Sequence, residues 1–312
     1  MANSKLGILV NLFLPQRRKP NPEYAIPEKY KNLEGKTIVF TGGTDGMGRV
    51  AVEMLYEMGA HVVVLGRNKT KIENVINEII KTGGSGKLGF QICDLASMDS
   101  VKNCAEQILA QYSKIDVLIN NAGINMTKPT FTSDGFETNW AVNYLGGFLL
   151  TKLLLPRIQQ SSPSRIVNLT TNTAFIDHID FDDIQSKPNF DTGDAYTQAK
   201  LSMNMFSIDL AKKLEGTGVT VNYLYPGYIK SNLLSNLEGP EKMMQFFMNV
   251  MASPTEVGAD RIIRLAISSE YEGKTGVYVY EDIIKPPHKE AQIESKRNHL
   301  KKISEKALKK WL

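Results

Sequence analysis

The chain has 312 residues, of which 42% are hydrophobic and 22% are charged. These values are close to the averages of globular proteins and exclude a disordered, collagen-like or coiled-coil chain. The formal net charge of +4 is concentrated at the ends: residues 1–20 carry +4, and residues 285–312 carry nine Lys or Arg against three Glu. The body between them is acidic, so no basic groove for nucleic acid is expected there.

Cysteine and histidine are scarce. The two cysteines, Cys93 and Cys104, provide no disulfide framework, and this usage is typical of a reducing compartment. The four histidines have no metal-ligand spacing, so we expect no catalytic metal. No apolar run approaches the roughly 20 residues that cross a bilayer. A cytoplasmic location is therefore expected, with peripheral membrane association as the alternative.

The N-terminal segment contains a short apolar run over residues 6–14, followed by Arg17, Arg18 and Lys19. A secretory signal would have its positive charges before the apolar run and a small-residue cleavage site after it, so none is predicted. The proline-rich stretch 15–27 indicates an extended connector.

Seven short apolar runs predict β-strands, and segments of helical period lie between them. The runs span residues 36–41, 61–66, 87–93, 117–120, 165–170, 219–225 and 276–280. They are rich in β-branched residues and lack polar alternation, which is typical of strands covered on both faces. Strands that alternate with helices predict one α/β domain with a doubly wound parallel sheet and helices on both faces.

A glycine-rich turn, TGGTDGMG, spans residues 41–48 between the first predicted strand and the helix after it. Glycines allow the backbone to turn tightly and to approach a ligand, and the N-terminus of a helix offers free N–H groups to a pyrophosphate. The spacing is GxxxGxG rather than the commoner GxGxxG. A plain turn is the alternative, but the strand before it and the helix after it favour a dinucleotide site.

Arg67 follows the second predicted strand, where an acidic residue would hold the ribose hydroxyls of NAD. A guanidinium can bind a 2′-phosphate through two hydrogen bonds. NADP(H) is therefore expected rather than NAD(H), the alternative being a solvated arginine at a strand end. Asp45 in the glycine-rich turn argues against NADP(H), because its charge would lie near the same phosphate.

Tyr196 and Lys200 are four residues apart in a segment of helical period and therefore share a helix face. A tyrosine with a pKa of ~10 is a poor base at neutral pH. An ammonium ~4 Å away, at an effective dielectric of ~20, would supply about the 4 kcal/mol that lowers this pKa by three units. The pair predicts a phenol that exchanges protons near pH 7. A lysine stem packed beside a half-buried tyrosine is the alternative.

Together these motifs resemble the short-chain dehydrogenase/reductase family over roughly residues 34–284. The matching segments, in the family's order, are TGGTDGMG (41–48), CDLAS (93–97), NNAG (120–123), VNYLGGFLLTKLLLP (142–156), RIVNLTT (165–171), YTQAK (196–200) and PGYIKSNL (226–233). Residues 134–156, the 24 residues between Thr171 and Tyr196, and VGADRII (257–263) are similar to the retinol-dehydrogenase-like branch.

The resemblance implies a Rossmann-type fold and a division of the chain into three parts. Residues 1–33 would be an N-terminal extension, residues 34–284 the dinucleotide-binding and catalytic domain, and residues 285–312 a basic C-terminal helix. Leu300, Ile303, Ala307, Leu308 and Trp311 recur at helical spacing in this last segment. Their pattern predicts an amphipathic helix that docks weakly on anionic membranes together with residues 6–14, or that packs on the protein itself.

The resemblance also implies a role for each matching residue. Tyr196 would be the general acid in reduction or the base in oxidation, Lys200 would lower its pKa and bind the nicotinamide ribose, and Asn143 would hold a water on a proton relay. Other residues would surround the cofactor: Gly42, Thr44, Gly46, Met47 and Gly48 at the pyrophosphate, Asp94 and Leu95 at the adenine, Asn121, Ala122 and Gly123 at the adenosine ribose, and Pro226, Gly227, Ile229 and Ser231 around the carboxamide.

Two positions depart from the family pattern. Thr171 stands where the family has its catalytic serine; it keeps a hydroxyl but adds a methyl group. Gly147 stands where the retinol-dehydrogenase-like branch usually has histidine. These departures motivate an alternative function, a dinucleotide-binding scaffold or sensor with impaired catalysis. A sugar-nucleotide epimerase or dehydratase also uses YxxxK, but its tighter glycine loop and larger C-terminal lobe are missing here.

Residues 228–252 would form the flap over the substrate in this family. A cluster of apolar side chains occupies this stretch: Met243, Met244, Phe246, Phe247, Met248 and Met251. Such a cluster indicates either core packing or an adaptable apolar binding surface. We expect a bulky apolar carbonyl or alcohol as substrate, such as a retinoid, a steroid, a fatty aldehyde or a polyketide-like molecule. The sequence indicates no particular oligomeric state.

Overall fold

The computed structural model describes residues 19–172, 178–188, 190–231 and 252–312. Its strands are β1 (Thr37–Thr41), β2 (His61–Gly66), β3 (Lys87–Ile92), β4 (Val117–Asn120), β5 (Ser164–Leu169), β6 (Val219–Tyr225), β7 (Tyr278–Tyr280) and β8 (Ile283–Lys285). The α- and π-helical elements of the described residues are α2 (Gly46–Glu57), α3 (Lys69–Ile80), α4 (Met98–Gln111), α5 (Thr138–Trp140), η3 (Ala141–Leu145), α6 (Gly146–Gln160), α7 (Thr192–Lys213), α9 (Thr255–Ile267), α10 (Lys289–Gln292) and α11 (Glu294–Ala307).

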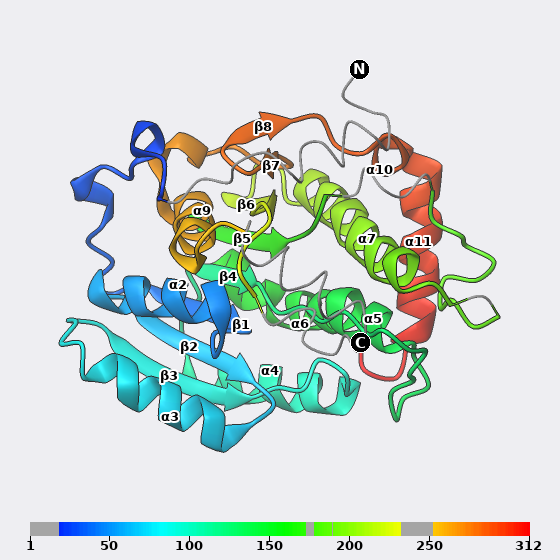
Figure 1. Ribbon diagram of the computed structural model, residues 1–312, viewed down its shortest axis with the longest axis horizontal. Helices are drawn as coiled ribbons and strands as arrows, with labels where there is room; N and C mark the ends of the chain where they lie inside the picture. Colours follow the sequence, from blue (N-terminus) through cyan, green and yellow to red (C-terminus); the bar gives the residue numbers. More distant parts are fainter. Residues whose placement is uncertain (1–18, 173–177, 189, 232–251) are drawn as a thin grey trace.

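All eight strands form one sheet in the order β3-β2-β1-β4-β5-β6-β7-β8 (Figure 1). The first seven are parallel, as predicted, and each lies within two residues of its predicted bounds. The eighth strand, β8, was not predicted. It pairs antiparallel with β7, its three residues are all exposed, and it crosses the expected domain boundary at residue 284. A short exposed edge strand lacks the buried apolar run that revealed the others.

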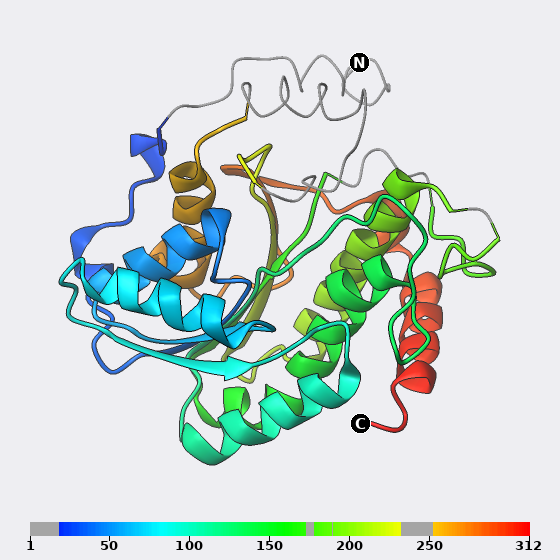
Figure 2. The same cartoon turned by 60° about the horizontal axis from the view of Figure 1, so that its bottom comes forward.

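Side chains of successive strand residues enter two separate cores. Ile38 and Phe40 of β1 pack with α2, α3 and α9, whereas Val39 between them packs with α4, α6 and α7. This follows from the alternation of side chains along a strand, and it explains why the runs show no regular alternation of apolar and polar residues. Figure 2 shows the resulting layers, with helices on both faces of the sheet.

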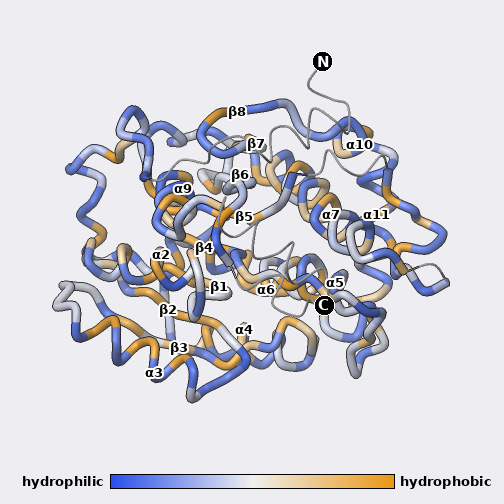
Figure 3. The backbone as a smooth tube through the Cα atoms, viewed as in Figure 1, coloured by the Kyte–Doolittle hydropathy of each residue, from blue (hydrophilic) through white to orange (hydrophobic). Residues whose placement is uncertain are grey.

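The helices present narrower apolar faces to these cores. In α3, Ile72, Val75, Ile76 and Ile79 are buried, and their spacing of three and four residues matches one helix face. Figure 3 shows this as apolar and polar stretches that alternate along the α3 tube.

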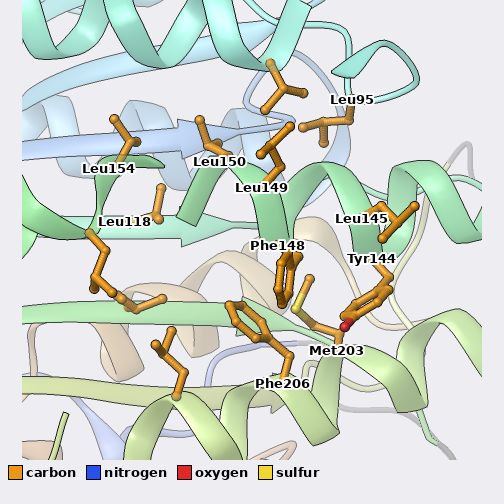
Figure 4. Close-up of a cluster of buried hydrophobic side chains, with 14 of the residues drawn as sticks. Leu95, Leu118, Tyr144, Leu145, Phe148, Leu149, Leu150, Leu154, Met203 and Phe206 are labelled. Carbon is orange, nitrogen blue, oxygen red and sulfur yellow. The ribbon is translucent and has the colours of Figure 1, made fainter. Parts of the chain in front are cut away.

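The core between the sheet and helices α6 and α7 is rich in aromatic and long aliphatic side chains. Phe148 of α6 and Phe206 of α7 lie with ring centroids 4.7 Å apart, and Met203 lies beside them (Figure 4). The two helices are thereby held together, and α7 is the helix that carries Tyr196 and Lys200.

The C-terminal helix α11 lies against α7 (Figure 1). Leu300, Leu308 and Trp311 are buried in the protein's own core, and the Trp311 indole donates a hydrogen bond of 2.7 Å to Asp99. The expected docking of this segment on membranes is therefore wrong for its apolar face, which the fold itself covers. The other half of that prediction, residues 6–14, lies outside the described residues.

The N-terminal part of the described chain also packs on the body. Ile26 and Leu33 are buried in the core formed with α2 and α9. None of the helices within the described ranges is long and apolar enough to cross a membrane.

The strand order reverses between β1 and β4. The chain proceeds from β1 outward to β3, and then returns to place β4 on the other side of β1. In open α/β sheets, ligands bind beyond the carboxyl ends of the strands at such a reversal. The turn after β1 and the segment after β4 meet at this point.

Candidate active site

A cavity of about 1670 Å³ lies at the carboxyl ends of the strands. This exceeds the roughly 300–1,000 Å³ of ordinary small-molecule pockets, so a dinucleotide can be accommodated. Its lining includes each residue that the sequence analysis assigned to the cofactor: Gly42, Thr44, Gly46, Met47, Gly48, Arg67, Asp94, Leu95, Asn121, Ala122, Gly123, Tyr196, Lys200, Pro226, Gly227, Ile229 and Ser231. Thr171 also lines it, but Asn143 does not.

The glycine-rich turn forms a cradle that side chains would fill. A Cβ at Gly42, whose φ is +71°, would lie 2.8 Å from the Ala122 Cα, and a Cβ at Gly48 would lie 2.2 Å from the Gly42 carbonyl oxygen. Above Gly46, the nearest described atom to such a Cβ would be the Lys230 oxygen, at 4.0 Å. The first turn of α2 therefore opens onto the cavity, as binding of a pyrophosphate requires.

The segment after β4 is fastened to this cradle. The Thr41 hydroxyl accepts hydrogen bonds of 3.0 Å from the backbone nitrogens of Asn121 and Ala122. The Asn121 side chain donates to the Thr41 and Gly42 carbonyl oxygens at 3.1 and 3.0 Å. These bonds fix two sides of the cavity relative to each other.

Arg67 is exposed, lines the cavity after β2 and makes no ion pair with any residue in the described ranges. Asp45, which argued against a 2′-phosphate, forms an ion pair of 2.9 Å with Lys71 of α3. Lys71 also lines the cavity. Lys71 was not predicted from the sequence, where it is one of several charged residues at the start of α3.

Asp94 and Leu95 border the cavity beyond β3. The Asp94 carboxylate accepts a hydrogen bond of 3.0 Å from the Ala96 nitrogen, and the Asp94 nitrogen donates one of 2.9 Å to the Ser100 hydroxyl oxygen. The turn is thus held by its own side chains, and Leu95 is buried.

Lys200 is buried within the site, with only 4% of its surface exposed. Its ammonium donates to the Leu169 carbonyl oxygen at 3.2 Å and lies 6.0 Å from the centre of the Tyr196 ring. A Cβ at Gly123 would lie 3.0 Å from Asn143 Oδ1 and 3.2 Å from Lys200 Nζ. The Gly123 backbone therefore packs directly against both side chains.

Asn143 lies behind the cavity wall, in the π-helical turn η3 between α5 and α6. Its Oδ1 accepts the Ile124 nitrogen at 3.0 Å, and its Nδ2 donates to the Ile124 oxygen at 2.9 Å. π-helical turns are frequent at functional sites. Both atoms of the Asn143 amide group are therefore hydrogen-bonded to the backbone of Ile124, the residue that follows Gly123.

Burial gives Tyr196 and Lys200 pKa values that differ from the sequence-based expectation. Burial raises the pKa of Tyr196 to about 12, while a hydrogen bond from the Thr171 side chain acts in the opposite direction. The expected lowering is therefore wrong for the protein alone, because the loss of hydration around the phenol outweighs the favourable interaction with Thr171. Burial also lowers the pKa of Lys200 to about 8.

The pKa of Lys200 predicts a pH dependence of stability. Between pH 8 and 10.5 the unfolded chain holds a proton on Lys200 that the folded chain has lost, so this residue's contribution to stability rises with pH. We expect Lys200→Met to be more stable than the parent by up to about 3 kcal/mol below pH 8, the free energy that corresponds to lowering the pKa from 10.5 to about 8.

Urea unfolding of both proteins at several pH values measures this difference. The difference in free energy of unfolding between Lys200→Met and the parent should decrease steadily from pH 8 towards pH 10.5. Lys213→Met, at an exposed position of the same helix, controls for removal of a charge. If the difference in free energy of unfolding between Lys200→Met and the parent stays constant over this range, the buried ammonium of Lys200 does not destabilise the fold.

Thr170 and Thr171 have different partners. The Thr170 hydroxyl donates to the Lys200 carbonyl oxygen at 3.3 Å, whereas the Thr171 side chain faces Tyr196. Gly147, the other departure from the family pattern, lies in the buried part of α6, where a Cβ would meet the Met203 methyl at 3.1 Å. It does not line the cavity.

The far end of the cavity is aromatic. Tyr225 and Tyr280 line it with ring centroids 4.9 Å apart, and Tyr228 lines it as well. Ile229 is held by a parallel bridge to Ser253. The sequence analysis missed the tyrosines, because strand periodicity does not show which residues border a cavity. Residues 228–252 were expected to form a flap that contains a cluster of Met and Phe side chains. That cluster spans residues 243–251 and lies outside the described residues.

Comparisons with known proteins identify the family of the chain. The family model described as short chain dehydrogenase matches residues 36–242. Retinol dehydrogenase 14 of Mus musculus is 36% identical over 260 residues, which cover 79% of this chain and 78% of the relative. Polyprenol dehydrogenase of Homo sapiens is 34% identical over 254 residues, with coverages of 79% and 77%. The crystal structure of an uncharacterized protein from Mycobacterium paratuberculosis superposes with a TM-score of 0.70 at 26% identity, covering 88% of this chain and 94% of that one.

The chain therefore belongs to the short-chain dehydrogenase family, whose members are oxidoreductases. Within that family its relatives place it in the retinol-dehydrogenase-like branch. Both parts of the resemblance seen in the sequence are confirmed.

Proposed function

We propose that the protein is an NADP(H)-dependent oxidoreductase that interconverts a bulky apolar carbonyl compound and its alcohol. The observation that carries the proposal is the meeting of Tyr196, Lys200 and Thr171 with the glycine cradle at one cavity. The bound cofactor would supply or accept a hydride at its nicotinamide. Proton transfer and positioning of the substrate oxygen would be carried out by side chains of the protein.

Tyr196 holds the proton that the reduced substrate oxygen receives. With a pKa of about 12, its phenol stays protonated at neutral pH and suits the role of general acid in carbonyl reduction. Lys200, with a pKa of about 8, exchanges protons close to neutral pH and lies on the same helix. Asn143 holds the Ile124 backbone beside Lys200, which supports a positioning role in the proton path.

Thr171 supports a catalytic rather than a scaffolding function. Its side chain lies close enough to Tyr196 to lower the pKa of the phenol, so its hydroxyl would be available where the substrate oxygen meets the phenol. The family's serine would act from the same place, and threonine retains the donor that this role needs. No observation on the described residues favours the scaffold function over the enzyme.

The preference for NADP(H) is supported by two cations at the adenosine end. Arg67 is exposed there, and Lys71 neutralises the charge of Asp45 across 2.9 Å. A 2′-phosphate would therefore meet an excess of positive charge, to which Arg67 can contribute charge-assisted hydrogen bonds.

We expect Arg67→Ala to weaken NADPH binding about 10–150-fold, the scale of one charge-assisted hydrogen bond. NADH binding should stay nearly unchanged, because NADH lacks the 2′-phosphate. Titration calorimetry with both cofactors measures the two affinities. Arg49→Ala is the matched control, since Arg49 pairs with Glu78 and does not line the main cavity. Equal losses for NADPH and NADH would contradict the assignment.

The substrate class is supported by the cavity wall and by the relatives. The cavity wall includes the apolar side chains of Ile124, Met126 and Val142 and the rings of Tyr225 and Tyr280. The names of two relatives, retinol dehydrogenase and polyprenol dehydrogenase, describe enzymes that act on bulky apolar alcohols. Retinoids, steroids, fatty aldehydes and polyketide-like carbonyls are the compounds to test.

The experiment is a panel of these carbonyl compounds, assayed with NADPH and with NADH. Acetaldehyde, which is too small to fill the cavity, serves as the control substrate. The proposal predicts oxidation of NADPH with at least one apolar compound, and a lower kcat/KM with NADH and with acetaldehyde. Absence of NADPH oxidation with the entire panel, despite NADPH binding, would favour the scaffold function.

A further inference from the structure

Arg261 of α9 is a charged residue in the interior, with 3% of its surface exposed. Its Nε and one terminal nitrogen donate to the two oxygens of Asp282 at 3.0 and 2.8 Å. Such a bidentate pair fixes the plane of the guanidinium, and therefore the direction of the remaining nitrogen.

The remaining nitrogen of Arg261 donates to the Pro226 carbonyl oxygen at 2.6 Å. Pro226 begins the loop that follows β6 and lines the cavity through Gly227, Tyr228, Ile229 and Ser231. Gly227 has a φ of +88°, and a Cβ there would lie 2.7 Å from that Arg261 nitrogen. The guanidinium thus packs directly against the backbone of the loop, which we call the β6 loop (residues 226–231).

The turn between β7 and β8 is fastened to the same loop. Glu281 has a φ of +56°, which is uncommon for a residue with a side chain. Its nitrogen donates to the Tyr225 oxygen at 2.7 Å, and its carboxylate lies 3.6 Å from Arg261. Glu281 and Asp282 both line the cavity. Arg261 therefore connects helix α9 to two segments that border the cavity, the β6 loop and the turn between β7 and β8.

The neighbouring Arg264 serves as a comparison, because it shares the burial and the Asp282 contact of Arg261 but not the bond to the β6 loop. It is also buried on α9 and also reaches Asp282, at 3.4 Å. Its guanidinium lies 4.6 Å from the centre of the Tyr24 ring, away from the β6 loop. Two buried arginines thus share one carboxylate, but only Arg261 bonds to the backbone of the β6 loop among the described contacts.

We propose that Arg261 is a positioning residue that holds the β6 loop in the shape that receives the nicotinamide half of the cofactor. This inference rests on the proposed function, since it assumes a dinucleotide in the cavity. Arg261 acts through the Pro226 carbonyl and through Asp282, without touching the cofactor. Its loss should therefore weaken only those ligands that reach the β6 loop.

The test compares Arg261→Lys with Arg264→Lys in the full chain. Lysine keeps the charge but cannot make the bidentate pair and the Pro226 bond together. Calorimetry gives the Kd values of NADPH and of 2′,5′-ADP, which contains the adenosine half without the nicotinamide. Emission of bound NADPH at saturation reports the environment of the nicotinamide, and thermal melting reports the fold.

We expect Arg261→Lys to weaken NADPH about tenfold or more, the scale of one charge-assisted hydrogen bond, and to change the emission of bound NADPH. Its affinity for 2′,5′-ADP should stay within about twofold of the parent. Arg264→Lys, which shares Asp282 but makes no bond to the β6 loop, should weaken NADPH much less than Arg261→Lys. If Arg261→Lys does not fold, Asp282→Asn, which weakens the same pair, should show the same selective loss.

Equal losses of NADPH and 2′,5′-ADP in Arg261→Lys would overturn the inference, as would the same selective loss in Arg264→Lys. Failure of the proposed function looks different, because the parent itself would then bind neither NADPH nor 2′,5′-ADP. The inference would fall with it in that case.

Discussion

Replacement of Tyr196 by phenylalanine is expected to lower kcat for carbonyl reduction about 10²–10⁴-fold, the usual contribution of a general acid. The change removes a single oxygen from a half-buried ring, so the fold and the affinity for NADPH should be retained. Steady-state kinetics and calorimetry on the same preparation separate the two effects.

Tyr228→Phe is the matched control for this variant. Tyr228 also lines the cavity and is also half-buried, so its loss tests whether any tyrosine hydroxyl in the wall matters. We expect kcat to change by less than about threefold, as for the loss of a hydroxyl outside the reaction. Substantial activity in Tyr196→Phe would mean that another group donates the proton.

Thr171→Val is expected to lower kcat about 10²–10³-fold, the usual loss when one hydrogen-bond donor to a developing oxyanion is removed. Valine is nearly isosteric with threonine but has no hydroxyl, so shape is kept while the donor to the Tyr196 region is lost. The measurement is kcat with a saturating apolar carbonyl compound and NADPH.

Thr171→Ser separates the hydroxyl from the β-branch. Serine retains the donor and lacks the methyl group that restricts χ1, so activity should be preserved or raised. If Thr171→Val turns over as fast as the parent, Thr171 has no catalytic role. If neither the parent nor Thr171→Ser oxidises NADPH with any compound of the panel, the scaffold function gains.

The parallel sheet and the glycine cradle were predictable from the sequence for one physical reason. Strands buried on both faces are predominantly apolar, and a close backbone approach such as that at Gly42 or Gly48 admits only glycine. Both requirements determine which residue types occur at these positions, so they can be recognised in the sequence. Strand β8 is exposed and pairs only at the sheet edge, so it cannot be recognised in this way.

Features that depend on three-dimensional packing could not be predicted in the same way. The period of α11 indicates an apolar face, but the same face suits a membrane or the protein's own core, and burial of Leu300 and Trp311 decides for the core. The spacing of Tyr196 and Lys200 fixes their helix face but not their depth. Burial then raises the Tyr196 pKa, where spacing alone predicted a lower one.

Charged residues that act through partners are the hardest to recognise. Lys71 gains its significance from the ion pair with Asp45, and Arg261 from its bonds to Asp282 and Pro226. These partners lie between 21 and 35 residues away from the arginine, and 26 residues from the lysine. In the sequence, Arg261 is only an arginine among apolar helix positions.

The most direct test of the account is to follow the hydride itself. NADPH carrying deuterium at both C4 positions is incubated with the most active apolar aldehyde of the panel, and the alcohol is analysed by mass spectrometry. The account predicts one deuterium on the carbinol carbon of the product formed by the parent enzyme, and a rate of labelling that falls about 10²–10⁴-fold in Tyr196→Phe. Binding of NADPH without any labelled alcohol, for every compound of the panel, would contradict it.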